Sequence, residues 1–98
     1  MVRASETLTV DDVVEINRRM IESSGGFSIP GSMLNRNSLE YILEAVNGSM
    51  FGQEMYPTIV EKAAAIGYTI IVNHIFHDAN KRTGIESCRI FLELNGYF

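Results

Sequence analysis

The chain contains little cysteine and few basic residues, and each shortage excludes a class of protein. Of its 98 residues one is cysteine, two are proline and none is tryptophan. The lone Cys88 cannot form an internal disulfide, which fits a reducing compartment. The net charge is −4, so we expect no broad basic face and no direct contact with nucleic acid.

Long hydrophobic runs are also missing. The longest lies between residues 63 and 72, whereas a helix that spans a bilayer needs roughly 20 apolar residues. The opening residues, Met-Val-Arg-Ala-Ser-Glu, lack the apolar stretch of a signal peptide. We therefore expect a cytoplasmic protein without a membrane partner, and a chain of this length is expected to form a single domain, residues 1–98.

Hydrophobic residues recur at helical spacing, and no segment alternates cleanly enough to predict a strand. Thr9, with Asp12 at the matching third position, is expected to cap the first helix, and Asn37, with Glu40, the second. The predicted helices cover residues 9–22, 37–47, 57–72 and 80–94, with a patternless loop at 27–36.

The third predicted helix is the most apolar part of the chain. Pro57 suits its first turn, and beyond Glu61 and Lys62 it carries no charge. We therefore expect a central helix with neighbours on most sides. Gly67 in its middle costs about 1 kcal/mol relative to alanine, and close approach of another helix would compensate. In the fourth helix the residues expected to face inward are Thr83, Ile85, Cys88, Phe91 and Leu92.

Between these two helices lies the segment richest in functional groups, His-Ile-Phe-His-Asp-Ala-Asn-Lys-Arg-Thr at residues 74–83. If Asn80 caps the fourth helix, Lys81 and Arg82 lie in its first turn, beside backbone N–H groups that attract anions. Cations in this turn are unfavourable, because they lie at the positive end of the helix dipole. Their presence is explained if they bind phosphate. Asp78 is then placed to hold Mg²⁺ together with ligand phosphates.

The remaining residues of the segment suggest phosphoryl-type transfer. His74 can accept a proton from a hydroxyl at neutral pH, and Phe76 would anchor the loop in the core. Such transfer requires mainly positioning and charge neutralisation. One alternative is a transition-metal site made by His74 and His77 with Asp78; another is that His74 is only a capping or surface residue. Cys88 is expected to be a core residue rather than a nucleophile.

The sequence resembles the Fic/Doc family and, within it, the death-on-curing (Doc) branch. The segment matches His-x-Phe-x-(Asp/Glu)-(Gly/Ala)-Asn-(Gly/Lys)-Arg, and Tyr56-Pro57-Thr58, the Glu61–Ala64 run and Asn73 also resemble that branch. The resemblance implies an all-α fold, a helical bundle around a central helix with a short β-like flap. The flap, which docks the target, would include Phe51, Gly52 and Gln53.

The resemblance also implies a role for each residue of the segment. His74 would be the general base, Asp78 the Mg²⁺ ligand and Phe76 the anchor, and the phosphate contacts would be Asn80, Lys81, Arg82 and Thr83. Most relatives carry glycine in place of Lys81 and transfer AMP; in the Doc branch the lysine accompanies transfer of the γ-phosphoryl group of ATP. The implied target is a translation elongation factor of the Tu class, and the outcome is arrested translation.

The inhibitory (Ser/Thr)-x-x-x-Glu-(Gly/Asn) segment of many relatives is missing from this sequence. The resemblance therefore implies inhibition in trans, by the antitoxin of a toxin–antitoxin pair. The family domain continues beyond the motif helix, so the chain is expected to be truncated, with C-terminal helices absent and self-association favoured. Two alternatives remain: an AMP transferase, and a non-catalytic module that binds nucleotide or antitoxin.

Overall fold

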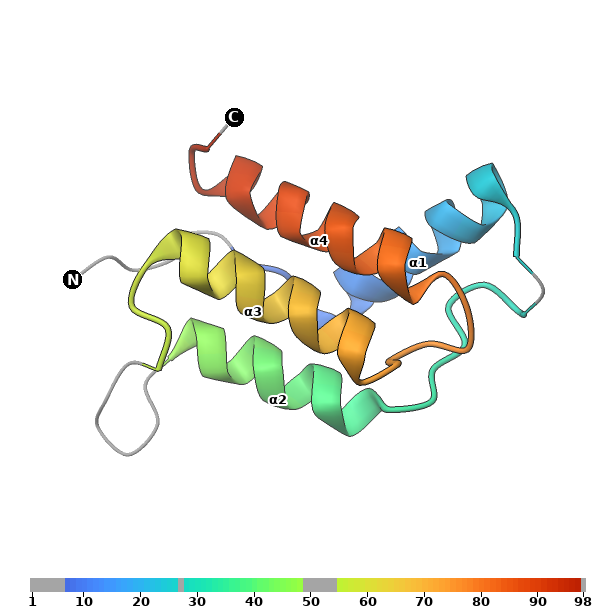
Figure 1. The fold of residues 1–98 in the computed structure, drawn as a ribbon, viewed down its shortest axis with the longest axis horizontal. Coiled ribbons are helices and arrows are strands. Elements are labelled where there is room, and N and C mark those ends of the chain that lie inside the picture. Colours follow the sequence, from blue (N-terminus) through green and yellow to red (C-terminus); the bar gives the residue numbers. More distant parts are fainter. Residues whose placement is uncertain (1–6, 27, 49–54, 98) are drawn as a thin grey trace.

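The fold is all-α, as expected. The computed structural model describes residues 7–26, 28–48 and 55–97, and Figure 1 shows the helices within them stacked side by side. They are α1 (Val10–Ser24), α2 (Arg36–Asn47), α3 (Ile59–Val72) and α4 (Asn80–Leu94). Phe51, Gly52 and Gln53, the predicted flap, lie outside the described residues. None of these helices is long and apolar enough to cross a bilayer.

Two of the helices begin with the same reciprocal cap. The Thr9 hydroxyl accepts from the backbone N–H of Asp12 at 3.1 Å, while the Asp12 carboxylate accepts from the Thr9 N–H at 2.9 Å. Thr58 and Glu61 form the equivalent pair at the start of α3. Each pair satisfies N–H groups that have no partner within the helix. The prediction for Thr9 is confirmed, whereas Pro57 precedes the α3 cap instead of lying in its first turn.

The prediction that Asn37 caps α2 is wrong. The helix begins at Arg36, and its N-cap is Asn35. The Asn35 side chain accepts no hydrogen bond from the helix either. Its amide is oriented by a different contact, in which Nδ2 donates to the carbonyl oxygens of Asn73 at 2.7 Å and of His74 at 3.2 Å. A contact with a distant loop has replaced the local cap, and it ties the start of α2 to the end of α3.

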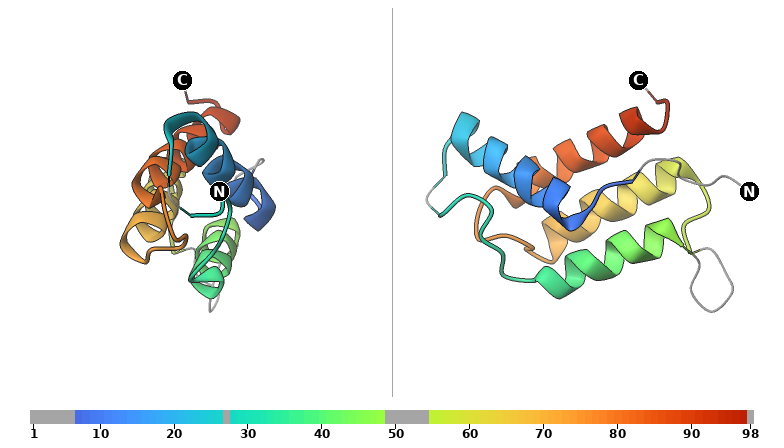
Figure 2. Two further views of the ribbon diagram at one scale, coloured as in Figure 1. Left: turned by 90° about the vertical axis from the view of Figure 1, so that its right-hand side faces the viewer. Right: turned by 180° about the vertical axis from the view of Figure 1, so that it is seen from behind.

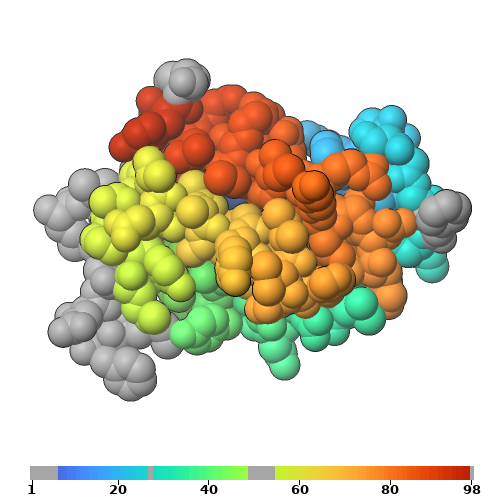
Figure 3. All heavy atoms as spheres, viewed as in Figure 1, coloured from blue at the N-terminus to red at the C-terminus, as the bar shows by residue number. Residues whose placement is uncertain are grey.

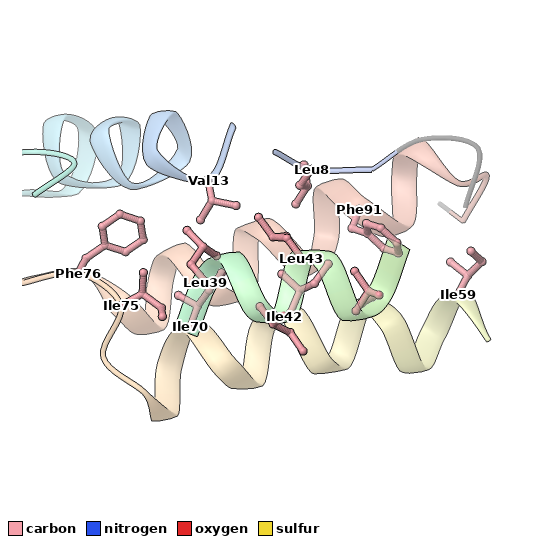
Figure 4. Packing of buried hydrophobic residues seen from close by; sticks show 13 residues of the cluster. Leu8, Val13, Leu39, Ile42, Leu43, Ile59, Ile70, Ile75, Phe76 and Phe91 are labelled. Carbon is pink, nitrogen blue, oxygen red and sulfur yellow. The ribbon is translucent and has the colours of Figure 1, made fainter. Parts of the chain in front are cut away.

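The core lies between α2, α3 and α4, with α1 closing one side. The view from behind in Figure 2 shows α1 on the side of the bundle opposite to the viewer of Figure 1, where it packs mainly against α4. In Figure 4, Ile75 and Phe76 lie at one end of the buried cluster and Phe91 towards the other. The apolar stripe of α2 is buried in it: Leu39, Ile42, Leu43 and Val46.

Helix α3 is central but is not covered on most sides. It packs against α2 and α4, while α1 packs against α4 and α2 instead. Val60, Tyr68 and Val72 are therefore about half exposed or more, at 54%, 68% and 49%, and α3 forms much of the surface in Figure 3 between α4 and α2. The expectation that α3 has neighbours on most sides is therefore wrong, because one of its faces is open to solvent.

The expected close approach at Gly67 is confirmed. A Cβ built on Gly67 would lie 3.1 Å from the Gly84 carbonyl oxygen, and one on Gly84 would lie 2.8 Å from the Gly67 oxygen. Helix α4 therefore presents Gly84 and Cys88 to α3, and Thr83 and Phe91 are buried with it. Ile85 points away and is 58% exposed, so its predicted inward orientation is wrong.

Candidate active site

The segment that connects α3 to α4 contains two residues in the left-handed conformation. His74 has φ 47° and Ala79 has φ 60°, and neither is glycine. Such a backbone costs of the order of 1 kcal/mol or more per residue and persists only where surrounding contacts hold it. These residues begin and end the connecting loop, so the contacts that hold the loop define the site.

The first set of contacts comes from residues 32–35. The N–H of Leu34 donates to the Ile75 oxygen at 2.7 Å, the N–H of His77 donates to the Ser32 oxygen at 3.2 Å, and Met33 forms an antiparallel bridge with Phe76. The segment expected to be a patternless loop therefore pairs with the motif in the manner of a strand. Periodicity could not reveal a pairing this short.

Phe76 is the buried anchor that the sequence predicts, with 0% exposure. Asn80 holds its backbone on both sides: the Phe76 N–H donates to Asn80 Oδ1 at 2.8 Å, and Asn80 Nδ2 donates to the Phe76 oxygen at 2.8 Å. Asn80 is thus the first residue of α4 and does not cap it; the N-cap is the left-handed Ala79. The predicted cap at Asn80 is wrong because its amide binds the loop.

His74 is exposed at the end of α3. Its Nδ1 lies 3.3 Å from the carbonyl oxygen of Val72. A carbonyl can only accept, so this contact places a proton on Nδ1, and of the two neutral tautomers it selects the one with its lone pair on Nε2. That tautomer is the one that can take a proton from an approaching hydroxyl.

Asp78 is half-buried one residue before the N-cap. Its Oδ1 accepts from the N–H of Ala79 at 2.8 Å, and a Cβ on Gly26 would lie 2.9 Å from its Oδ2. The absence of a side chain at residue 26 therefore lets the end of the α1 segment lie against the carboxylate. Among the described residues, no three His, Cys, Asp or Glu are grouped to hold a metal, so His74, His77 and Asp78 do not form a three-ligand site there.

The two cations of the motif have different environments. Lys81 is exposed in the first turn of α4, where the first backbone N–H groups have no acceptor within the helix. Arg82 is half-buried, and its guanidinium donates to the carbonyl oxygens of Met20 at 3.1 Å and Gly25 at 2.9 Å. Arg82 therefore binds the end of α1 in this structure, a contact that its sequence position does not predict.

Thr83, another predicted phosphate contact, is fully buried. Its hydroxyl accepts from Nδ2 of Asn17 at 3.1 Å. The same Nδ2 donates to the Asp78 carbonyl oxygen at 3.0 Å, and Asn17 Oδ1 accepts from the Gly31 N–H at 2.8 Å. Sequence reasoning missed Asn17. The only signal was an amide four residues from both Val13 and Ile21, on the apolar face of α1.

His77 and Cys88 have surroundings that fit structural roles. His77 is exposed, and its Nδ1 lies 2.9 Å from the Ser32 hydroxyl and 3.2 Å from the Ser32 carbonyl oxygen. Cys88 is half-buried on the side of α4 that faces α3. Burial raises the pKa of its thiol, which disfavours the nucleophilic thiolate.

A family model described as the Fic/DOC family matches residues 7–92, a range that contains the whole loop, α1 to α3, and α4 except for its last two residues. The chain belongs to the Fic/DOC family. The curated protein "Toxin Doc" of Mycolicibacterium smegmatis is 28% identical over 83 residues, which are 83% of this chain and 64% of that relative. This Fic/DOC chain therefore spans less than two thirds of the length of the relative.

Proposed function

We propose that this Fic/DOC chain is a Doc-type toxin that transfers a phosphoryl group from ATP to a hydroxyl of a translation factor of the elongation factor Tu class. The observation that supports it best is the start of α4. There the exposed Lys81, the free backbone N–H groups of the first turn and the Asp78 carboxylate lie next to one another in sequence. This combination suits a polyphosphate held with a cation.

In the proposed reaction, His74 Nε2 takes the proton of the target hydroxyl. The hydroxyl oxygen forms a bond to the terminal phosphorus of ATP, and the bond from that phosphorus to the bridging oxygen breaks. ADP leaves with the electron pair. Lys81 and the helix N-terminus would stabilise the charge on the phosphate oxygens throughout the transfer.

The donors present fit Mg²⁺ held jointly by the protein and the nucleotide. Asp78 supplies one carboxylate, and phosphate oxygens and water would complete the coordination. When bound, Mg²⁺ would supply charge neutralisation between the phosphates. Thr83 is left out of the proposed phosphate contacts because its hydroxyl is buried against Asn17. Arg82 could contact phosphate only through those of its N–H groups that do not donate to the Met20 and Gly25 oxygens.

AMP transfer is the second candidate. It differs in which phosphorus is attacked, and Lys81 is the residue on which the choice depends. A glycine at this position would let the backbone approach a phosphate, whereas the lysine side chain fills that room and adds a charge. The lysine favours the γ-phosphoryl reaction.

The experiment that separates these reactions uses ATP labelled at the γ or at the α phosphate. The chain is incubated with purified elongation factor Tu, and γ-label is expected on the factor. Transfer of α-label would show that the reaction is AMP transfer and not phosphoryl transfer. His74→Ala is expected to abolish labelling, and His77→Ala, a histidine in the same exposed loop, is the matched control and should retain it within about threefold. Absence of any label would favour a non-catalytic binding module.

The cellular role follows from the same reaction. Expression of the chain should arrest growth, because a phosphorylated translation factor would no longer support protein synthesis, and His74→Ala should grow normally. The relative is named a toxin, and the proposed partner in trans is an antitoxin that covers the motif. Growth arrest that persists in His74→Ala would contradict the catalytic explanation.

A further inference from the structure

Asn17 in α1 donates from its side chain to two residues of the motif, Asp78 and Thr83, although nothing in the expected chemistry uses it. It is fully buried, and a buried amide is destabilising unless its groups are hydrogen-bonded. The backbone partners also fix its orientation. The Gly31 N–H can only donate, so it faces Oδ1, and the Asp78 carbonyl can only accept, so it faces Nδ2.

The bond to Asp78 holds one end of the peptide unit that joins Asp78 to Ala79. The carbonyl of this peptide accepts from Asn17 at 3.0 Å, and its N–H donates to Asp78 Oδ1 at 2.8 Å. Rotation of the peptide would break both bonds at once. Asn17 therefore acts on the Asp78 carboxylate through a rigid peptide, and on the left-handed Ala79 that begins α4.

The second donation reaches the first turn of α4. The Thr83 hydroxyl accepts from Asn17 at 3.1 Å, and the Thr83 N–H donates to the Ala79 oxygen at 2.9 Å. One amide group thus binds on both sides of Ala79 and fixes the direction in which the helix N-terminus points relative to the carboxylate. The same side chain also holds the 28–35 segment through Gly31.

We propose that Asn17 is a positioning residue, which sets the Asp78 carboxylate and the N-terminus of α4 for a nucleotide held with a cation. The proposal rests on the function proposed above, since it concerns the same site. It gives α1 a role in nucleotide binding as well as in packing. This role is indirect, whereas His74 and Lys81 would contact the reacting groups themselves.

Asn17→Asp is the variant that tests it. Aspartate has the same shape and still accepts from the Gly31 N–H. It cannot donate to the Asp78 oxygen or to the Thr83 hydroxyl, although that hydroxyl can turn and donate to it instead. The KM for ATP is expected to rise about fivefold or more and kcat to fall about 10- to 100-fold, because a small misplacement of binding groups is that costly. The KM for the target protein should stay within about twofold.

The control is Ser87→Ala, which also alters a buried polar side chain, one turn further along α4 than Thr83. Its kcat and both KM values should equal those of the unchanged chain. All assays are run under conditions in which circular dichroism shows that each variant is folded. A purely structural role would lower the amount of active protein, and so the apparent kcat, without changing the KM for ATP. An unchanged KM for ATP in Asn17→Asp therefore overturns the proposal.

Two binding measurements distinguish failure of this proposal from failure of the proposed function. Mg-ATP binding is measured by calorimetry for the unchanged chain and for Asn17→Asp. If the chain binds Mg-ATP but transfers nothing, the kinase function fails, and a weaker affinity in the variant still supports the positioning role. If the chain binds no Mg-ATP, both fail. Where Asn17→Asp does not fold, Asn17→Ser takes its place, and failure of both variants to fold assigns Asn17 a purely structural role.

Discussion

The side-chain amide of Asn80 spans the backbone of Phe76, accepting from its N–H and donating to its carbonyl oxygen, both at 2.8 Å. The buried phenyl ring and the first residue of α4 are thereby joined across the loop that carries His77, Asp78 and Ala79. An asparagine is suited to this because it offers one acceptor and one donor at the spacing of a peptide group. The ring can then be fixed in the core while the loop stays at the surface.

Asn80→Asp should separate these two contacts. The carboxylate still accepts from the Phe76 N–H, but it faces the Phe76 oxygen without a proton to donate. We expect a loss of about 1–3 kcal/mol in the free energy of unfolding, measured by urea denaturation, together with weaker Mg-ATP binding in calorimetry.

The comparison for this variant is Asn95→Asp, near the other end of α4. Asn95 Nδ2 donates to the Phe91 oxygen at 2.9 Å, so this substitution also replaces a donor that faces a phenylalanine carbonyl, but far from the motif loop. It should be destabilising without affecting ATP binding. Equal effects of the two variants on binding would contradict a specific role for Asn80 in the loop.

Gly84→Ala should be much more damaging than Gly67→Ala. A Cβ on Gly84 would lie 2.6 Å from Ile71 Cγ1 and 2.8 Å from the Gly67 oxygen, whereas one on Gly67 would lie 3.1 Å from the Gly84 oxygen. Overpacking of this kind typically costs about 1–3 kcal/mol, and we expect Gly84→Ala at the upper end of that range.

For Gly67→Ala, the milder contact is offset by about 1 kcal/mol gained in helix propensity, so its net effect should be small. Thermal unfolding of both variants measures the difference. Similar melting temperatures would mean that α3 and α4 can shift apart to accommodate a methyl group, which would contradict a rigid contact at these glycines.

The sequence predicted the helices well and their asparagines poorly. The caps at Thr9 and Thr58 depend on residues three positions away. That spacing predicted the cap at Thr9, whereas at α3 the expected residue of the first turn was Pro57, which lies before the cap. Asn37 and Asn80 were expected to be caps, but the N-cap of α2 is Asn35. Asn35 donates to Asn73 and His74, far along the chain, and Asn80 donates to the loop. Spacing cannot choose between a local and a distant partner of equal strength.

At the site, the burial of Phe76 was predictable, because an apolar ring in a polar loop belongs in the core. His74 and Lys81 are exposed, and their expected roles stay predictions. What could not be predicted is how α1 reaches the loop. Arg82 binds the Met20 and Gly25 oxygens, and Asn17 binds Asp78. These contacts depend on how two helices far apart in the sequence pack, and no local pattern encodes that.

Cys88 should react slowly with alkylating reagents. Burial raises the pKa of its thiol above the ordinary value, and only the thiolate is nucleophilic. At pH 8, where an unperturbed cysteine is partly ionised, Cys88 in the folded chain should react with iodoacetamide about tenfold more slowly than the same residue in urea. Because the folded pKa is the higher one, the difference should persist as the pH rises towards it and should narrow above it. Equal rates at pH 8 would contradict the buried environment.

Arg82→Lys tests whether the motif arginine acts through α1 or on phosphate. The guanidinium donates to two carbonyl oxygens, those of Met20 and Gly25, with two different nitrogens. A lysine keeps the positive charge but has one nitrogen and cannot reproduce the fork. Losing one such bond should cost about 1 kcal/mol or somewhat more in the free energy of unfolding, and denaturant titration measures this directly.

Lys81→Ala is the companion variant, because Lys81 carries the same charge in the same helical turn but is exposed. If Arg82 acts mainly by holding the end of α1, Arg82→Lys should be destabilised yet bind Mg-ATP within about threefold of the unchanged chain, since charge is retained. Lys81→Ala should show the opposite pattern: normal stability and an affinity about tenfold weaker, which corresponds to the loss of one charged contact to phosphate. An Arg82→Lys variant that unfolds normally but binds ATP weakly would instead place the guanidinium on the phosphates, with the α1 contacts given up when nucleotide binds.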